Sequence, residues 1–323
     1  MGDKKILFSL EKSLKFYFPD FFSSLSPAKK ILLKKILRER SFQNAISVWE
    51  KHLISQQLVD KNWQRPTQKD IDDKKRRPLA LKFATWLVDD FFSIDVKDLG
   101  SPKKHFPKKT LFVCNHPCGA IDGLALLCKL YKTYGDAAMI ANAALQSFFY
   151  LAPAICPVNV FYPNQPKDLK PLISAMKSPI PLLSFPAGKV ARKINGRVSD
   201  SKWNSSFLSS CLRYKRNLVL VHIDAENSAF FYNTATIRKF LRIQSNLEML
   251  WLPYEFFNSK KKNITMRFSS LITPKHLYDM LKVRKRGDLE LAEQSKNQEK
   301  IAEAMRVFVE NTLSNNPGAT FKL

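Results

Sequence analysis

The stretch Leu111–Leu127 reads LFVCNHPCGAIDGLALL and contains the change from strand to helix that decides the fold. Its first residues, Leu111–Cys114, form a short apolar run of the length of a buried strand. Asn115-His116-Pro117 and a turn of small residues follow, and Asp122 lies near the start of an apolar helix. A strand that leads directly into a helix is typical of α/β proteins.

The same alternation continues through the rest of the chain. Further strands are predicted at Ala138–Ala141, Val158–Phe161, Ile180–Phe185, Asn217–Ile223 and Ile264–Ser269. Helices are predicted at Pro78–Phe92, Ile121–Lys132, Ala143–Leu151, Lys167–Lys177, Lys202–Tyr214, Thr234–Leu241 and Leu289–Leu313. The pattern predicts an α/β fold in which helices flank a mixed, mostly parallel sheet.

Residues 1–75 differ from this pattern and predict a helical, basic N-terminal extension before an α/β domain over residues 76–323. Ser26 is a candidate N-cap with Pro27 after it, and the helix Ala28–Arg40 sets Ile and Leu against Lys and Arg. Such a helix suits an anionic bilayer surface, but it also suits packing on its own domain with a solvated lysine face. The polar stretch Arg65–Arg77 is interpreted as a linker.

The composition is that of a globular chain with a large excess of positive charge. Of 323 residues, 45% are hydrophobic and 25% charged, and 53 Lys+Arg against 28 Asp+Glu give a net charge of +25. A charge this large predicts a polyanionic partner: an anionic membrane, an acidic carrier protein or nucleic acid.

No secretory signal is recognisable at the start of the sequence, and the 5 cysteines have no regular spacing, which fits a reducing compartment. The uncharged segment Ala137–Tyr162 is interrupted by Pro153 and Pro157, so we interpret it as a buried strand–helix–strand rather than a membrane span. The predicted location is the cytoplasm, peripheral on the inner face of the membrane.

His116 and Asp122 are the candidate catalytic pair. An imidazole can take a proton from a hydroxyl near neutral pH, and a carboxylate can orient it and stabilise its protonated form. If Asp122 folds back onto His116, the substrate's own hydroxyl serves as the nucleophile. Three alternatives remain for this segment: a structural histidine at a strand end, a zinc site using Cys114 and Cys118, and a Cys118 nucleophile.

A second segment, IPLLSFPAGKVARKINGRVSDSKW over residues 180–203, combines a buried strand with a cluster of cations. Lys189, Arg192, Lys193 and Arg197 in one short loop predict a seat for a phosphate or another anionic headgroup, with a solvated basic loop as the alternative. In a third segment, NLVLVHIDAENSAFFY, His222 is interpreted as structural rather than as a second base.

Taken in order, these segments resemble the lysophospholipid acyltransferase superfamily of glycerolipid O-acyltransferases, in particular its bacterial glycerol acyltransferase or haemolysin-like branch. The resemblance covers residues 108–274 and rests on NHPCGAIDGLALL, FPAGKVARKINGR with Trp203, VHIDAENSAFFYN and NLEMLWLPYEFF. It implies an O-acyltransferase, similar to 1-acylglycerol-3-phosphate acyltransferases, that acts in membrane lipid biosynthesis.

The resemblance also implies roles for individual residues. His116 is then the general base and Asp122 its partner. The implied substrate-binding residues are Asn115, Gly188, Lys189, Arg192, Lys193 and Arg197. The implied acyl donor is a thioester of acyl carrier protein or coenzyme A, the acceptor is a glycerol-phosphate-type or lyso-lipid hydroxyl, and no metal or other cofactor is expected.

The second motif departs from the common form Phe-Pro-Glu-Gly-Thr-Arg. Ala187 stands at the glutamate position, Lys189 at the threonine position and Val190 at the arginine position. The acceptor therefore stays open between lysophosphatidate and a lyso-aminolipid. A non-catalytic lipid-binding relative is one alternative function. A nucleic-acid-binding protein, with basic clusters at Lys260–Lys262 and Arg284–Arg286, is another.

Overall fold

The computed structural model describes residues 26–36, 39–59, 74–100, 106–148, 150–159, 169–194, 196–241, 248, 251–281 and 291–322. Several predictions lie outside these residues: the linker between residues 65 and 73, the basic cluster Arg284–Arg286, and the second half of the strand predicted at Val158–Phe161.

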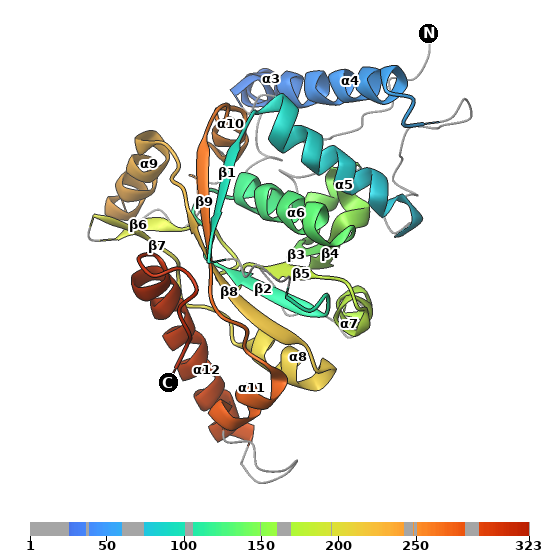
Figure 1. The fold of residues 1–323 in the computed structure, drawn as a ribbon. Helices are drawn as coiled ribbons and strands as arrows, with labels where there is room; N and C mark the ends of the chain where they lie inside the picture. Colours follow the sequence, from blue (N-terminus) through green and yellow to red (C-terminus); the bar gives the residue numbers. More distant parts are fainter. Residues whose placement is uncertain are drawn as a thin grey trace.

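A seven-stranded sheet organises the described part of the chain, in the order β1-β9-β8-β2-β5-β3-β4 (Figure 1). Its strands are β1 (Asp95–Leu99), β2 (Thr110–Cys114), β3 (Ala138–Asn142), β4 (Ile155–Val158), β5 (Leu182–Ser184), β8 (Asn217–Asp224) and β9 (Asn263–Phe268). All neighbouring strands are parallel except β8 and β9. The predicted mixed, mostly parallel α/β sheet is confirmed.

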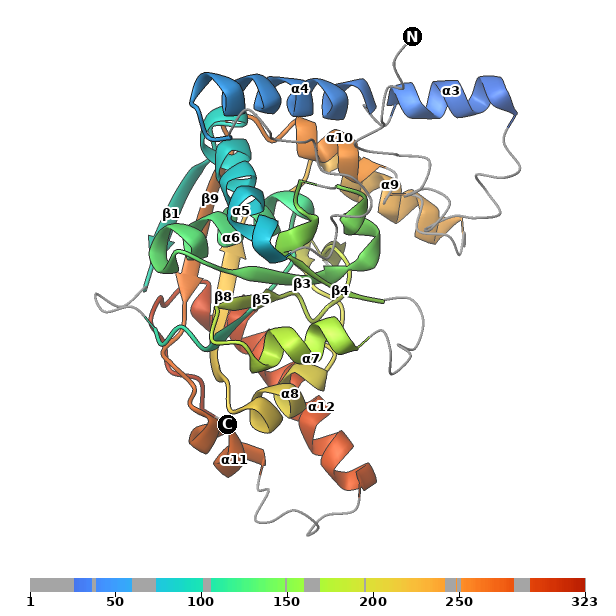
Figure 2. The same ribbon diagram turned by 90° about the vertical axis from the view of Figure 1, so that its right-hand side faces the viewer.

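Helices cover both faces of this sheet, and each face has its own hydrophobic core (Figures 1 and 2). On one face lie α4 (Glu39–Ser55), α5 (Arg77–Trp86), a π-helical turn (Leu87–Phe91) and α6 (Ala120–Tyr134). On the other lie α7 (Lys170–Lys177), α8 (Ser206–Tyr214), α11 (Pro274–Leu281) and α12 (Leu291–Val307), which continues as the π-helical η7 (Phe308–Leu313). Strand β2 is buried on both sides, which explains its continuous apolar sequence.

Three smaller elements lie near the carboxyl ends of the central strands. A separate two-stranded hairpin consists of β6 (Arg192–Ile194) and β7 (Arg197–Ser199). The helix α9 (Ala229–Phe240) follows β8, and α10 (Leu252–Phe257) precedes β9. The hairpin corrects the prediction of one short basic loop, which failed because strands of three residues carry too little periodicity to recognise.

Two predicted elements differ from the structure for recognisable reasons. The strand predicted at Val158–Phe161 begins earlier, as β4, because Pro157 is accommodated in an edge strand. The helix predicted at Ala143–Leu151 is replaced by short 3₁₀ turns at Ala143–Ser147 and Ala152–Ala154. Strand β1 was not predicted, because its sequence DVKDL is polar and largely exposed.

The N-terminal region contains the predicted amphipathic helix as α3 (Pro27–Ile36), with the Lys29 N–H 3.4 Å from the Ser26 hydroxyl. The helix after it, α4, packs its apolar side chains into the same core as α5 and α6, led by Trp49 and Leu53. At the other end of the predicted linker, Arg77 is already helical and pairs with Asp136 at 2.6 Å. The division of the chain at residues 75 and 76 stays a prediction.

The described residues between 137 and 162 contribute β3, the two 3₁₀ turns and β4, so the middle of the predicted strand–helix–strand consists of 3₁₀ turns and not of an α-helix. Within the described ranges, no helix has both the length and the apolar character needed to cross a bilayer.

Candidate active site

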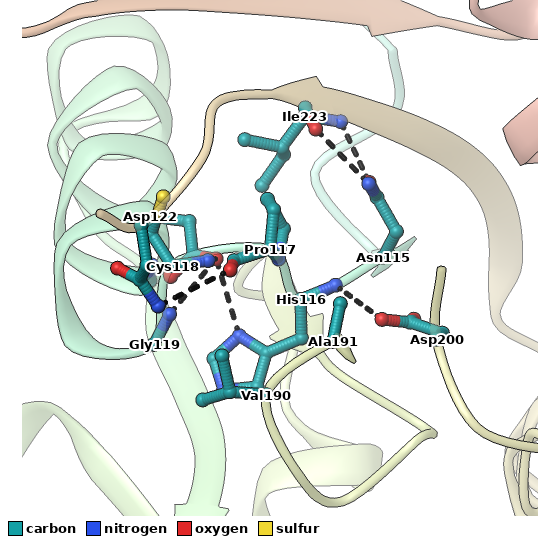
Figure 3. A network of polar contacts seen from close by, with 12 residues as sticks. Asn115, His116, Pro117, Cys118, Gly119, Asp122, Val190, Ala191, Asp200 and Ile223 are labelled. Carbon is teal, nitrogen blue, oxygen red and sulfur yellow. Dashed lines mark hydrogen bonds and ion pairs between the residues drawn. The ribbon is translucent and has the colours of Figure 1, made fainter. Parts of the chain in front are cut away.

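His116 and Asp122 come together where β2 ends and α6 begins (Figure 3). His116 Nδ1 lies 3.3 Å from Asp122 Oδ2, and the histidine side chain keeps 18% of its surface exposed while the aspartate is fully buried. The contact has the distance of an ion pair rather than the alignment of a hydrogen bond, and Nδ1 has no aligned hydrogen-bond partner among the described residues. With Nδ1 directed at a carboxylate, Nε2 is the ring nitrogen left to exchange a proton with a substrate.

The carboxylate of Asp122 is fixed by the start of α6. Its Oδ2 accepts the N–H groups of Cys118 at 2.8 Å and Gly119 at 3.2 Å, and its Oδ1 accepts that of Gly123 at 3.2 Å. Gly119 is the N-cap with φ of 93°, a conformation that favours glycine. These three main-chain donors fix the position of the carboxylate, so Asp122 can hold the imidazole without moving.

A second carboxylate, which the sequence analysis missed, holds the main chain of His116. Asp200 Oδ1 accepts the His116 N–H at 3.0 Å, while its Oδ2 accepts the Trp203 indole N–H at 2.9 Å (Figure 3). The His116 carbonyl accepts the Ala191 N–H at 2.7 Å, and Phe185 stacks on the imidazole at 4.2 Å. The signal for Asp200 was present in the quoted motif, since an aspartate stands three residues before the tryptophan.

The surroundings of His116 favour its protonated form. Burial by itself lowers the pKa of His116, but the charges of Asp122 and Asp200 outweigh burial and the nearby Arg192, so the pKa is raised. Burial also raises the pKa of Asp200 to about 6, although Trp203 and the His116 N–H oppose this shift.

We expect the pH dependence of turnover to reflect this environment. A general base must be neutral, so kcat/KM rises with pH as His116 loses its proton, and the raised pKa places that rise above pH 6.5. Asp200→Asn removes one of the negative charges that favour the imidazolium, so its profile should move to lower pH. Steady-state kinetics over a pH series checks this. A profile that moves to higher pH, or does not move, would contradict the effect of the Asp200 charge on the pKa of His116.

Asn115 lies beside the pair, but its side chain is engaged with β8. Its Nδ2 donates to the Ile223 carbonyl at 3.0 Å, and its Oδ1 accepts the Ile223 N–H at 2.7 Å. The amide therefore ties the end of β2 to β8. Its assignment as a substrate-binding residue stays a prediction.

The cations predicted to bind substrate fall into two groups. Arg192 is half-buried and pairs with Glu248 at 2.9 Å, and the fully buried Glu248 also accepts Arg238 at 2.7 Å. Lys189, Lys193 and Arg197 are exposed on and beside the β6–β7 hairpin, after a turn at Gly188 with φ of 67°. Of these four cations, Arg192 is the one whose charge lowers the pKa of His116.

Cys114 and Cys118, on either side of His116, are both buried. Burial raises the pKa of Cys118 to about 12 and that of Cys114 also well above its usual value, so neither thiol is poised as a nucleophile. The described residues contain no group of three or more His, Cys, Asp and Glu side chains arranged to hold a metal ion.

His222 has the character of a structural histidine. Burial lowers its pKa to about 4, and its Nδ1 faces the Arg267 guanidinium at 3.4 Å.

The basic cluster Lys260–Lys262, which the nucleic-acid alternative invokes, does not form one continuous surface. Lys262 Nζ points inward to Cys118 Sγ at 3.4 Å, and Lys260 lies over the Phe91 ring at 5.6 Å.

This chain is similar to a family model, to curated proteins and to a solved structure. Residues 74–300 match a family model described as acyltransferase. A protein of Bacteroides thetaiotaomicron named lyso-glycine lipid O-acyltransferase is 36% identical over 173 residues, which are 52% of this chain and 63% of that protein. A protein of the same name from Phocaeicola vulgatus is 34% identical over 176 residues, 54% of this chain and 62% of its own length.

The match thus spans less than two thirds of the length of these curated relatives. A solved structure, the 1-acyl-sn-glycerophosphate acyltransferase PlsC from Thermotoga maritima, aligns with a TM-score of 0.42 and 13% sequence identity over 88% of this chain and 97% of that one.

Proposed function

The chain belongs to the acyltransferase family, whose model covers residues 74–300, and from this premise we propose that it moves a fatty acyl group from an acyl thioester to the hydroxyl of a lyso-lipid. The observation that carries the proposal is the contact of His116 Nδ1 with Asp122 Oδ2 at 3.3 Å, on a main chain fixed on both sides. A buried carboxylate on one ring nitrogen leaves the other free to act as a base.

The proposed reaction needs no nucleophile from the protein. His116 Nε2 takes the proton of the acceptor hydroxyl as its oxygen bonds to the thioester carbonyl carbon. Asp122 stabilises the imidazolium that forms, and its negative charge fixes the tautomer in which Nδ1 carries a hydrogen. When the tetrahedral intermediate collapses, the carbon–sulfur bond breaks and the imidazolium returns its proton to the leaving thiolate. The products are an O-acyl lipid and a free thiol.

For the acceptor, we propose a lyso-aminolipid with a single negative charge, such as a lyso-glycine lipid. The two relatives that carry this name support the choice.

For the donor and the location, the proposal follows the charge of the chain. A net charge of +25 attracts an acidic acyl carrier protein or the phosphates of coenzyme A, and it attracts the anionic inner face of a membrane. Membrane association would also bring the enzyme to its lipid acceptor.

Lipid mass spectrometry tests the proposed acceptor. Deletion of the gene should cause one lyso-lipid to accumulate and its O-acylated product to disappear, and expression of the full chain in a host that makes the lyso-lipid should form that product. His116→Ala is the matched control, because it should be expressed but inactive. Accumulation of lysophosphatidate would correct the headgroup, and an unchanged lipid profile in both experiments would refute the proposed function.

A further inference from the structure

The outer side of α9 presents large apolar side chains to solvent. Phe230 is 51% exposed, Ile237 58%, Phe240 86% and Leu241 59%. The Leu241 N–H still bonds to the Ile237 carbonyl at 2.9 Å, so the helical geometry continues through this residue. We call these four residues the α9 stripe.

The α9 stripe follows from the helical period. Phe230, Ile237 and Leu241 are spaced i, i+7 and i+11, which places them on one face of a helix. The opposite face is buried, with Phe231 at 0% exposure and Tyr232 and Ala235 at 3%. The helix is therefore already anchored to the protein, and the stripe is a second apolar face that nothing in the described residues covers. Several exposed apolar side chains on one helix face indicate a contact with a membrane or another macromolecule.

The buried face of α9 connects to the candidate active site. Phe231 and Tyr232 form a small hydrophobic cluster with Val190. Val190 directly precedes Ala191, which binds the His116 carbonyl, and a Cβ on Gly119 would meet Val190 Cγ2 at 3.2 Å. One layer of side chains thus separates α9 from the turn that carries His116 and Asp122.

Positively charged side chains are exposed on elements near the α9 stripe. The hairpin strand β6 packs against α9 (Figure 1), and the hairpin exposes Lys193 and Arg197, with Ile194 46% exposed between them. Both views also place α3, with exposed Lys29 and with Ile31 at 69% exposure, in the same upper part of the molecule (Figures 1 and 2). Apolar side chains bordered by Lys and Arg are the pattern of helices that lie in the surface of an anionic bilayer.

We propose that the α9 stripe is a docking surface for an anionic lipid bilayer, which brings the turn at His116 to the membrane where the acceptor resides. The choice of a membrane over other partners rests on the proposed function, since a lyso-lipid acceptor is an amphiphile of the bilayer. Trp251, whose ring meets that of Phe230 at 4.8 Å, adds an aromatic side chain suited to the headgroup zone. In this arrangement Lys193 and Arg197 contact lipid headgroups.

Vesicle binding by the purified full chain tests the docking surface. The variant is Ile237→Ser combined with Phe240→Ser, which removes apolar surface without touching the core. On vesicles of phosphatidylcholine and phosphatidylglycerol we expect at least about tenfold weaker binding than wild type, because each side chain loses apolar burial in the bilayer. Tyr278→Ser is the matched control, since Tyr278 is 40% exposed on α11 at the far end of the molecule and should bind as wild type does.

Further outcomes separate this proposal from the proposed function. The variant should retain wild-type turnover on acceptor dispersed in detergent and lose it on acceptor in vesicles. A wild type that binds vesicles but transfers no acyl group would refute the function and leave the docking surface standing. Equal vesicle binding by variant and wild type would overturn the docking surface. So would a wild-type dimer that the variant abolishes without a change in vesicle binding, since the stripe would then contact a second copy.

Discussion

Replacing His116 with alanine is expected to lower the rate of acyl transfer by about 10²–10⁴-fold, the range that a positioned general base contributes. The imidazole is the only side chain that the structure places on Asp122 Oδ2 at ion-pair distance among the described residues. Without it, the acceptor hydroxyl must lose its proton to water, and the leaving thiolate has no positioned acid. Turnover with saturating thioester, measured by release of free thiol, gives the effect directly.

The fold should survive this substitution. His116 keeps part of its surface exposed, and the hydrogen bonds at this position use its main chain, which alanine retains. Thermal unfolding of the variant should therefore stay close to that of the wild type. A folded His116→Ala protein with near-normal turnover would show that the proton is removed by another group.

Comparison of two substitutions, Asp122→Asn and Asp122→Ala, separates the effect of Asp122 on catalysis from its effect on stability. Asp122→Asn preserves the volume of the side chain but offers an N–H in place of one carboxylate oxygen. If that N–H faces Nδ1, the imidazole must carry its hydrogen on Nε2 and cannot accept a proton there. We expect turnover to fall by about 10²–10⁴-fold, as expected for loss of the base itself.

Asp122→Ala should also destabilise the protein. It leaves the N–H groups of Cys118 and Gly119 without their acceptor at the start of α6. Loss of such a cap lowers the free energy of unfolding by about 1–2 kcal/mol. Denaturant unfolding of the two variants should therefore rank alanine below asparagine, while both are inactive. Full activity in a stable asparagine variant would mean that Asp122 caps the helix and does nothing more.

Local sequence patterns predicted much of the fold. The apolar runs that became β2, β5 and β8 contain consecutive buried residues, whereas β3 is buried at its first two residues and β9 at alternate positions. Edge and surface strands were missed, because β1 is polar and the β6–β7 hairpin is too short to show a period. Helix α4 follows the predicted N-terminal helix in the sequence. Only the packing of its Trp49 on Trp86 and Phe83 shows that its apolar face belongs to the core.

In the candidate active site, too, the contacts between residues close in the sequence were predictable and those between distant residues were not. His116 and Asp122 are six residues apart, so one strand-to-helix turn brings them together and the sequence could predict their contact. Asp200 is 84 positions from His116 along the chain, and Glu248 is 56 from Arg192. Such contacts depend on how the sheet assembles, which no local pattern records. The same limit explains why the basic motif suggested four equivalent cations, although Glu248 sets Arg192 apart from the three that are exposed.

The central claim is that His116, held by Asp122, activates the hydroxyl of a lyso-lipid toward a thioester. Its most direct test incubates purified wild type and His116→Ala with an acyl thioester and a lyso-glycine lipid, and measures thiol release and O-acyl product together by mass spectrometry. We predict one O-acyl lipid formed per thiol released by the wild type, and neither above background for the variant. Equal product from both proteins, or thiol released by the wild type with only free fatty acid formed, would contradict the claim.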